Sequence, residues 1–389
     1  MVDMHVTLVG SHPLPDEPSQ GGVQRVVQVL RRGLAERLRV SLVVPDSSRS
    51  LRHVDASGEI IYLKIPACPR ILTYWSWCSR ATYRAVERFS PDIVHVQDLA
   101  GFSLLWPRYH GKRSRPWIFT PHGVNDREVA FKADTDMARR MTASLRSSFL
   151  RSVERISRGR FDISIVINSY LFDAMPDLTK MHNRLIPNPV DEVFLTSSDD
   201  SCNRTEGYNL LYVGEVSARK NVLALVRMMS EIVRRGVDAH LHIVGPFAED
   251  QYLKTCLGAV EDMNLNSFIT FHGNACPQDL VWWMDKSDVL VLASKQETAP
   301  MVVAEAHCRG LAVAVPHAFG LVSMVSEGKD GVFLSGQDLS EDASRVLNLL
   351  TSGLDREAIR RDAARKYKLE HVIDSTIDVY QQALRTRQT

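Results

Sequence analysis

Two glutamates flank a short segment whose residue types suit the binding of an anion. Glu297 and Glu305 have seven residues between them, and the buried-strand pattern 288–293 comes shortly before the pair. Pro300 suits the first turn of a helix, where a missing N–H costs nothing, and Gly310 suits the end of that helix. The pattern therefore predicts a strand, a loop and a helix whose amino end presents free N–H groups and a positive dipole end.

The dimensions of this predicted helix start match those of a nucleotide sugar. A helix amino end favours a diphosphate, and the rise from Pro300 to Glu305 covers about 7.5 Å, which is close to the span from a diphosphate to a ribose. Glu297 is then left to face the group on the other side of the diphosphate. The alternative is an ordinary helix with a surface glutamate at each end. We favour the nucleotide site, with contacts from Thr298, Ala299, Pro300, Met301, Val302 and Glu305.

A second segment places cations near another predicted helix start. Strand 208–213 ends in Gly214, and Arg219 and Lys220 follow where the next helix should begin. A fixed cation at that position would neutralise a diphosphate and stabilise it as a leaving group. The alternative is a Lys/Arg pair on a solvated helix start. We interpret Gly214, Arg219 and Lys220 as part of the same nucleotide site.

Glycine and histidine residues at other predicted strand ends are further candidates. Gly21 and Gly22 close a long loop after the first strand, and glycine lets backbone amides approach a ligand closely. His122 follows another strand, and the carboxyl ends of parallel strands form the crevice in which such sheets bind ligands. A lone histidine is more often a structural residue, but this position favours a site. Gly245 and His272 end two later strands and are expected to line the nucleotide base and ribose.

Short β-branched runs alternate with helical patterns along nearly the whole chain, which predicts parallel sheets in α/β domains. The polar stretch 197–207 separates two groups of such runs and is typical of an interdomain linker. We therefore expect a first domain over 1–196 and a second over 207–368, each with a crevice at the carboxyl ends of its strands. The expected strands are 4–9, 39–44, 59–64, 92–97, 116–120, 162–167, 208–213, 239–244, 268–272, 288–293 and 311–315.

The composition is that of a globular chain. Of 389 residues, 44% are hydrophobic and 24% are charged, as in water-soluble domains. A net charge of +1 gives no general reason to bind nucleic acid. The six cysteines show no CxxC pair, which favours reduced thiols in the cytoplasm over disulfides or zinc ligands. The first residues lead directly into a strand, so we expect no secretory signal, and no apolar run reaches the length of a membrane span.

The segment Glu297–Glu305, with its Glu-Thr-Ala-Pro start, resembles the E-x7-E signature of retaining glycosyltransferases with the GT-B fold, family 4 in particular. The resemblance covers essentially the full length. It implies two Rossmann-like domains facing across a cleft, with the last helix, about 369–389, crossing back to the first domain. In the family, the first glutamate contacts the donor hexose and the second holds the ribose hydroxyls.

The resemblance also implies roles for residues outside that signature. Gly21–Gly22 matches the glycine-rich loop that touches the donor phosphates or the acceptor, and His122 matches a histidine that contacts the transferred sugar. Lys220 matches a family lysine. Family members usually carry an arginine directly after the glycine, where this chain has Glu215, so Arg219 is expected to supply the missing guanidinium. Asn188 matches a hinge motif ahead of the linker and is assigned a structural role.

The implied activity is transfer of a hexosyl or N-acetylhexosaminyl group from a nucleoside diphosphate sugar, with UDP or GDP as the expected nucleotide. The acceptor would be a saccharide or a lipid-linked molecule in glycan biosynthesis. Glu297 would orient the hexose while the acceptor hydroxyl attacks from the face that the diphosphate leaves, because no second carboxylate is placed as a nucleophile. We expect no cofactor and no metal, since Asp134–Asp136 begins a helix-like segment and suits a cap better than a metal site.

Basic amphipathic stretches in the first half raise a membrane hypothesis. Residues 136–160 contain seven arginines against two acids, with apolar residues near helical spacing. Residues 71–88 add Tyr74, Trp75 and Trp77 to three arginines. One interpretation is peripheral docking on anionic lipid at the inner face of the membrane. The other is that these helices cover the sheet and turn their arginines to water.

Two other functions share the predicted architecture. A non-catalytic protein that binds nucleotide sugars is favoured by Glu215 alone. A nucleotide-sugar 2-epimerase has the same two-domain plan, but it lacks the pattern from Glu297 to Glu305 and ranks lower.

Overall fold

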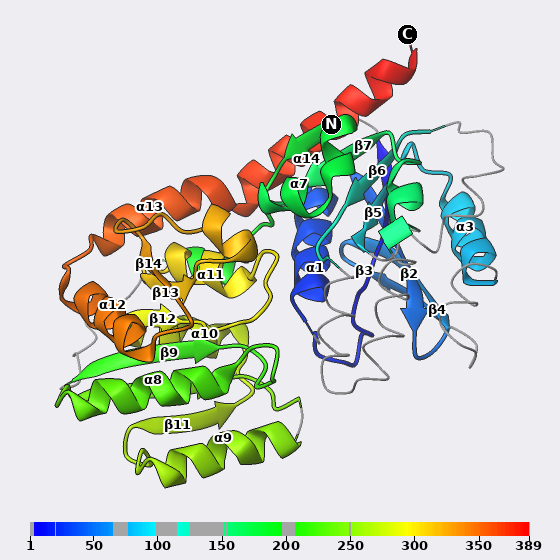
Figure 1. Ribbon diagram of the computed structural model, residues 1–389. Helices are drawn as coiled ribbons and strands as arrows, with labels where there is room; N and C mark the ends of the chain where they lie inside the picture. Colours follow the sequence, from blue (N-terminus) through cyan, green and yellow to red (C-terminus); the bar gives the residue numbers. More distant parts are fainter. Residues whose placement is uncertain are drawn as a thin grey trace. The chain divides into compact units, whose positions relative to one another are not determined.

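The chain folds into two compact α/β units (Figure 1). The first comprises Met1–Pro189 with Leu369–Thr389, and the second comprises Val190–Lys368. The computed structural model describes residues 4–19, 21–64, 77–98, 115–124, 151–152, 154–196, 207–248 and 250–388. The polar stretch expected to be a linker lies outside these residues from 197 to 206.

The first unit is built on one sheet in which every neighbouring pair is parallel except β3 with β4. The order of the strands is β3 (Leu51–Asp55), β4 (Gly58–Lys64), β2 (Arg39–Ser47), β1 (His5–Val9), β5 (Ile93–Gln97), β6 (Trp117–Thr120), β7 (Ile163–Val166) and β8 (Asn183–Leu185). The central strands β1, β5, β6 and β7 are short and fully buried, as expected when helices cover both faces of a parallel sheet.

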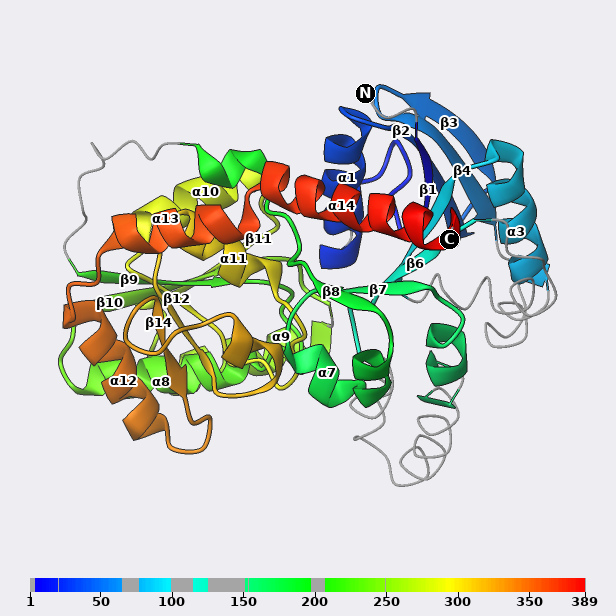
Figure 2. The ribbon, with the colours of Figure 1, turned by 90° about the horizontal axis from the view of Figure 1, so that it is seen from above.

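Two helices that are far apart in the sequence share one face of this sheet. Helix α1 (Gly22–Ala35) contacts α14 (Leu369–Gln388), the last helix of the chain (Figure 2). Their apolar faces join one core cluster with β1, in which Ile373 is 1% exposed and Tyr380 is fully buried. The prediction that the last helix returns to the first domain is therefore confirmed.

The opposite face has a smaller core. Helix α3 (Trp77–Phe89) contacts β2 and β4, and buried Val86 and Phe119 belong to its cluster. Short helical segments complete this unit near β7 and β8: α7 (Tyr170–Ala174) and η2 (Pro176–Lys180).

The second unit has a fully parallel sheet. Its order is β11 (Ile269–Gly273), β10 (Ala239–Val244), β9 (Tyr208–Val213), β12 (Val289–Val291), β13 (Val313–Pro316) and β14 (Gly331–Leu334). The helices, shown on both faces of the sheet in Figure 2, are α8 (Val222–Arg234), α9 (Asp250–Asp262), α10 (Pro277–Lys286), α11 (Met301–Cys308), α12 (Leu339–Thr351) and α13 (Arg356–Tyr367). Two 3-10 segments complete it, η3 (Glu192–Leu195) and η4 (Phe319–Ser323).

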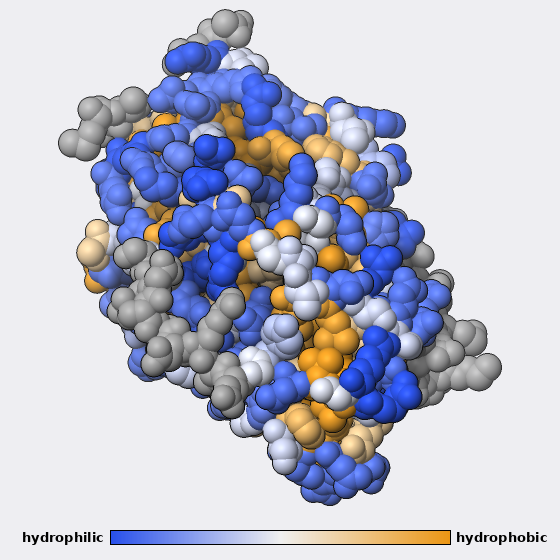
Figure 3. Space-filling view, turned by 90° about the vertical axis from the view of Figure 1, so that its left-hand side faces the viewer, coloured by the Kyte–Doolittle hydropathy of each residue, from blue (hydrophilic) through white to orange (hydrophobic). Residues whose placement is uncertain are grey.

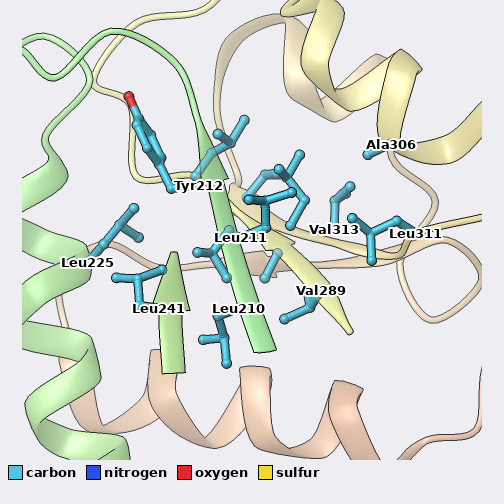
Figure 4. Close-up of a cluster of buried hydrophobic side chains, with 14 of the residues drawn as sticks. Leu210, Leu211, Tyr212, Leu225, Leu241, Val289, Ala306, Leu311 and Val313 are labelled. Atoms are coloured by element: carbon cyan, nitrogen blue, oxygen red, sulfur yellow. The ribbon is translucent and has the colours of Figure 1, made fainter. Parts of the chain in front are cut away.

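The core of the second unit centres on β9. Leu210, Leu211 and Tyr212 are all fully buried, and they pack among side chains from the neighbouring strands and helices (Figure 4). The hydroxyl of Tyr212 points away from this cluster (Figure 4) and donates to the carbonyl of Glu215 at 2.8 Å. The tyrosine therefore ties the strand end to the loop that follows it.

The first unit ends earlier than the predicted boundary at residue 196. Val190 and Phe194 are fully buried in the core of the second unit, and the Val190 amide donates to the carbonyl of Tyr367 at 3.0 Å. Asn188, expected near a hinge, is 9% exposed and directly precedes this boundary. The predicted boundary was too late because these residues form no regular strand or α-helix, whereas the burial of their apolar side chains attaches them to the second unit.

Over the described residues, the surface of the protein is mostly polar, because most apolar side chains are buried in the two cores. Most of the face in Figure 3 is hydrophilic, and the exposed large apolar side chains among the described residues come from both units: Val54, Ile156, Leu185, Phe247, Leu257, Met263, Trp282 and Val322. Among the helices of the described residues, none combines the length and the apolar character that a membrane crossing requires.

Candidate functional site

Two loops at the carboxyl ends of β9 and β12 are joined in the second unit. The strands are neighbours and parallel, so the loops leave the same edge of the sheet. The amide of Lys295 donates to the carbonyl of Arg219 at 2.9 Å, and the Arg219 guanidinium donates to the carbonyl of Gln296 at 3.4 Å. These bonds bring two predicted motifs together that lie far apart in the sequence.

The most informative contact of the site is an ion pair between Lys220 and Glu297, whose Nζ and Oε1 atoms are in contact. The Glu297 side chain is 7% exposed and the Lys220 side chain 17%. A carboxylate buried to this extent requires a charged partner or several donors, and Lys220 supplies the charge. The pair places a cation and an acid side by side at the sheet edge.

The helix after Glu297 begins without a side-chain cap. Pro300 is the N-cap residue, with φ −65° and ψ 116°, and α11 starts at Met301. The predicted position of Pro300 inside the first turn was therefore wrong by one residue, because its extended ψ angle belongs to a cap. The Val303 amide donates to the carbonyl of Pro300 at 3.1 Å. The N-cap residue Pro300 makes no side-chain hydrogen bond to the start of α11, which leaves these N–H groups suited to an anion.

Glu305 lies inside α11 and is 2% exposed. Burial raises the pKa of the nearby Cys308 thiol to about 12, and the charge of Glu305 adds to that shift. Gly310 follows the C-cap residue Arg309, as predicted for the helix end, with φ +70° and an added Cβ only 2.5 Å from the carbonyl oxygen of Arg356. A side chain there would need both strained backbone and displaced neighbours.

Two predicted glycines meet at the ends of β9 and β10. A Cβ on Gly245 would lie 2.0 Å from the carbonyl oxygen of Gly214, and its φ is +145°. The Gly214 amide donates to the carbonyl of Val244 at 2.9 Å, and the Gly245 amide donates to that of Gly273 at 2.7 Å. These glycines let the strand ends approach one another beside the loop that carries Lys220.

Buried serine hydroxyls in the same two loops were not singled out by the sequence. Ser217 is 5% exposed and Ser294 is 2% exposed, and neither Oγ atom has a hydrogen-bond partner among the described residues. Serine is common in loops, so the sequence gives no reason to single out these two residues. Only their burial distinguishes them from other loop serines.

His272 lies in a different cluster of the second unit. Its Nε2 atom is 3.1 Å from Nδ1 of His242, and its ring centroid is 4.3 Å from that of Trp283. Burial lowers the pKa of His242 to about 4 and also lowers the pKa of His272. The structure therefore places His272 with aromatic neighbours on β10 and α10, whereas Lys220 and Glu297 pair with each other.

The glycine pair of the first unit marks the start of α1. Gly21 is the N-cap residue, without a side-chain cap, and α1 begins at Gly22. An added Cβ on either glycine would meet nothing within 4 Å. Among the described residues, no neighbouring atom therefore requires a glycine at either position.

His122 is 8% exposed and follows β6. Its Nε2 atom is 2.7 Å from Oε1 of Gln97, at the end of β5. Burial lowers the pKa of His122 to about 4, so the ring is neutral at physiological pH. Sequence analysis did not identify Gln97 as a partner, because that contact depends on the pairing of β5 with β6.

Other predicted features fall outside the described residues. These are the acidic pair Asp134–Asp136, the aromatic residues Tyr74 and Trp75, and most of the basic stretch 136–160. Within the described part of the chain, no group of three or more His, Cys, Asp or Glu residues is arranged to hold a metal ion.

Family models match both halves of the chain. Residues 20–194 match the model described as Glycosyltransferase Family 4. Residues 207–352 match the model described as Glycosyl transferases group 1.

Curated relatives are distant. A D-inositol 3-phosphate glycosyltransferase of Corynebacterium urealyticum is 25% identical over 176 residues, which is 43% of this chain and 42% of that protein. For three relatives with this name, the match spans 42% to 51% of their length, or about half. An uncharacterised 41.2 kDa protein from the cps region of Klebsiella pneumoniae is 22% identical over 74% of this chain and 78% of its own.

Solved structures share the fold over the whole chain. Sucrose-phosphate synthase from Thermosynechococcus elongatus superposes with a TM-score of 0.80 at 20% identity, covering 97% of this chain and 98% of that one. Anabaena HepE, solved in complex with UDP and glucose, gives a TM-score of 0.73 at 12% identity over 97% and 100% of the two chains. At these identities the likeness shows a common fold.

Proposed function

The chain belongs to glycosyltransferase family 4, with the GT-B fold, and we propose that it is a retaining glycosyltransferase that uses a nucleoside diphosphate sugar. The observation that carries the proposal is the ion pair of Lys220 with Glu297, directly before the uncapped start of α11. Together these features offer a cation and free N–H groups to a diphosphate, and an acid to the sugar attached to it.

The donor is proposed to be a UDP- or GDP-hexose or N-acetylhexosamine. Support for the nucleotide class comes from Anabaena HepE, a structural neighbour solved with UDP-glucose. In this chain Glu305 would hold the ribose hydroxyls, and Gly214 and Gly245 would border the nucleotide. Glu297 would orient the hexose, since its side chain lies beside the cation that we assign to the diphosphate.

The proposed reaction joins an acceptor hydroxyl oxygen to the anomeric carbon. The bond from that carbon to the diphosphate breaks on the same face, and the hydroxyl proton leaves with the nucleotide. Lys220 and Arg219 would stabilise the charge that develops on the leaving diphosphate. We propose that no divalent ion is needed, and excess EDTA in the assay should then leave the rate unchanged.

The acceptor is proposed to be a saccharide or a lipid-linked molecule in glycan or polysaccharide biosynthesis. One structural neighbour is by its name a lipopolysaccharide outer core galactosyltransferase, WaaB. Another, the Staphylococcus aureus protein TarM, was solved with α-GlcNAc-glycerol and UDP. We also propose a cytoplasmic protein with peripheral contact to anionic membranes. Flotation with anionic liposomes tests that contact, and its absence would remove the membrane hypothesis.

A donor screen tests the central proposal. UDP-, GDP- and dTDP-sugars are incubated with the protein, and release of nucleotide is measured. Glu297→Gln should lose most turnover, roughly a hundredfold, while nucleotide affinity stays within about twofold because the contact is with the sugar. Glu261→Gln, at an exposed position of α9, is the matched control and should keep wild-type rates. Equal turnover in the two variants would remove Glu297 from the mechanism.

A second candidate function is binding of nucleotide sugar without transfer. Glu215, at the position where family members carry arginine, favours it, because a carboxylate near the diphosphate opposes its binding. Normal nucleotide binding without turnover of any donor in the screen would support this alternative.

A further inference from the structure

A continuous row of buried polar side chains connects His122 to the last helix of the chain. His122 contacts Gln97 at 2.7 Å, and Nε2 of Gln97 lies 3.0 Å from Nε2 of His95. The other ring nitrogen of His95 lies 2.7 Å from the hydroxyl of Tyr380, on α14. The hydroxyl of Thr120 adds a contact of 2.8 Å to His95 Nε2. All five residues belong to the first unit.

The orientation of the Gln97 amide sets the direction of the hydrogen bonds that run from His122 to Tyr380. The Gln97 oxygen can only accept and its nitrogen can only donate. His122 must therefore carry its proton on Nε2, while His95 accepts at Nε2 and carries its proton on Nδ1. The Nδ1–H group of His95 then donates to the Tyr380 hydroxyl. Neither ring is charged, since burial lowers the pKa of His95 to about 3 and that of His122 to about 4.

Reversal of this pattern requires several changes at once. If the Gln97 amide turned over, its N–H would meet the N–H of His122 and its oxygen would meet the lone pair of His95. Both histidines would have to move their protons together. Gln97 and His95 are each 1% exposed and Tyr380 is fully buried, so water cannot readily satisfy a reversed partner. A buried polar group left without its hydrogen bond costs about 1 to 3 kcal/mol.

The outer nitrogen of His122 remains available to a ligand. Within the described part of the chain, no hydrogen bond reaches its Nδ1 atom. With the proton held on Nε2, Nδ1 is an acceptor, and a sugar hydroxyl is a donor of suitable strength. The tautomer decides whether His122 accepts a hydrogen bond from a substrate or donates one to it.

We propose that Gln97 is a positioning residue for His122, and that Tyr380 of α14, acting through His95 and Gln97, keeps Nδ1 of His122 as a hydrogen-bond acceptor for a substrate hydroxyl. The role of the acceptor atom rests on the proposed function. The tautomer itself does not, because it follows from the hydrogen bonds of the protein alone. The last helix thereby takes part in the chemistry of the site as well as in the packing of the first unit.

Nitrogen NMR of the full-length protein labelled with 15N-histidine tests the tautomer directly. The His122 and His95 signals are assigned by their loss in His122→Gln and His95→Gln. In the wild type at neutral pH, we expect the proton of His122 on Nε2 and that of His95 on Nδ1. Gln97→Met and Tyr380→Phe should each move a measurable fraction of the His122 proton to Nδ1. Because Tyr380→Phe removes a single oxygen atom, it serves if Gln97→Met does not fold.

A matched control and an activity measurement complete the test. Tyr367→Phe removes the hydroxyl of a buried tyrosine in the second unit that has no hydrogen-bond partner among the described residues, and it should leave the His122 signals unchanged. With UDP-glucose and GDP-mannose as probes, Tyr380→Phe should lower kcat about tenfold and change the donor KM less than about twofold.

The possible results separate this inference from the proposed function. A wild-type His122 protonated on Nδ1, or a His122 tautomer unaffected by both Gln97→Met and Tyr380→Phe, would overturn the inference. A tautomer change without a fall in kcat would overturn the role of Nδ1 as acceptor. If the wild type shows the expected tautomers but turns over no donor, only the transferase proposal is contradicted. The positioning of His122 by Gln97 is then still supported.

Discussion

In the protein without a bound donor, the opposite charges of Lys220 and Glu297 neutralise each other. Their ion pair is mostly shielded from water, so each charge depends on the other. We expect Lys220 to reach the diphosphate through its other N–H groups, while the carboxylate of Glu297 accepts from the sugar hydroxyls. The same contact therefore stabilises the unliganded loops and prepares the two groups for different parts of one ligand.

A double-mutant cycle tests the dependence of the two residues on each other. Lys220→Met should lower the free energy of unfolding by about 2 to 3 kcal/mol, because it leaves a buried carboxylate without its partner. Adding Glu297→Gln should restore most of that loss, since no charge then remains unpaired, whereas turnover should stay abolished. Urea unfolding of the wild type and three variants gives the coupling energy. Additive stability losses would show that the pair does not interact in solution.

At the scale of elements, α14 packs closely on α1 at a glycine. A Cβ on Gly33 would lie 2.8 Å from Cγ1 of Ile373 and 2.9 Å from Cδ1 of Leu369. Such contacts are too short, so the helices approach one another only because this position lacks a side chain. The close approach buries the apolar face of α14 against the sheet of the first unit.

Alanine at Gly33 should therefore destabilise the protein by about 1 kcal/mol, since crowding of the two side chains outweighs the gain in helix propensity. The matched control is Gly258→Ala in α9, where an added Cβ meets nothing within 4 Å. That change should stabilise the protein by about 0.5 to 1 kcal/mol. Chemical denaturation measures both variants. The same sign for the two would contradict the close packing of α1 with α14.

The ends of β5 and β6 predict a dependence of stability on pH. The pKa values of His95 and His122 in the folded state, about 3 and about 4, lie below the ordinary value of 6.5. Between these values the unfolded chain binds more protons than the folded protein, so stability falls as the pH drops below about 6.5. Each histidine contributes up to about 1.4 kcal/mol per pH unit.

Urea unfolding at pH 7, 6 and 5 measures this slope, with the wild type compared with His122→Gln. The variant keeps every other histidine but lacks the one proton that His122 binds on unfolding. Its free energy of unfolding should therefore fall less steeply as the pH is lowered. Parallel slopes in the two proteins would show that His122 is not buried as a neutral ring.

At the scale of the whole molecule, the chain connects its two units twice, at Pro189–Val190 and at Lys368–Leu369. Lys220, Glu297 and Glu305, which we assign to the diphosphate, the hexose and the ribose, belong to the second unit. His122 and the start of α1 belong to the first unit together with α14. Each unit has its own apolar core. The effect of a ligand or a mutation on stability can therefore be measured for each unit separately.

UDP should stabilise the second unit more than the first. At about a hundred times its dissociation constant, a ligand adds about 2.7 kcal/mol to the unit that binds it. Hydrogen exchange followed by mass spectrometry in increasing urea separates the two unfolding transitions. Ile373→Ala, in α14, should lower the first unit's transition, and Val346→Ala, in α12, should lower that of the second, both through lost burial. Equal protection of both units by UDP would place the nucleotide elsewhere.

Most features that depend on interactions between residues close in the sequence were predicted correctly, and most features that depend on distant residues were not. The strands buried on both sides, such as β1 and β9, were located from their β-branched runs. Short strands at or near the sheet edges, such as β3, β8 and β14, were missed, since they are brief and partly exposed. The strand before Glu297 and the helix end at Gly310 were predictable because apolar runs and glycine act locally.

The sequence by itself determined the α/β class, most strands and the segments that carry the candidate residues, since these depend on neighbours within a few positions. Only the tertiary structure decided that Lys220 pairs with Glu297, that Gln97 holds His122, and that His272 joins an aromatic cluster. Those contacts depend on strand order, because parallel strands bring together loops that are distant in sequence. Local patterns carry no record of which strands will be neighbours.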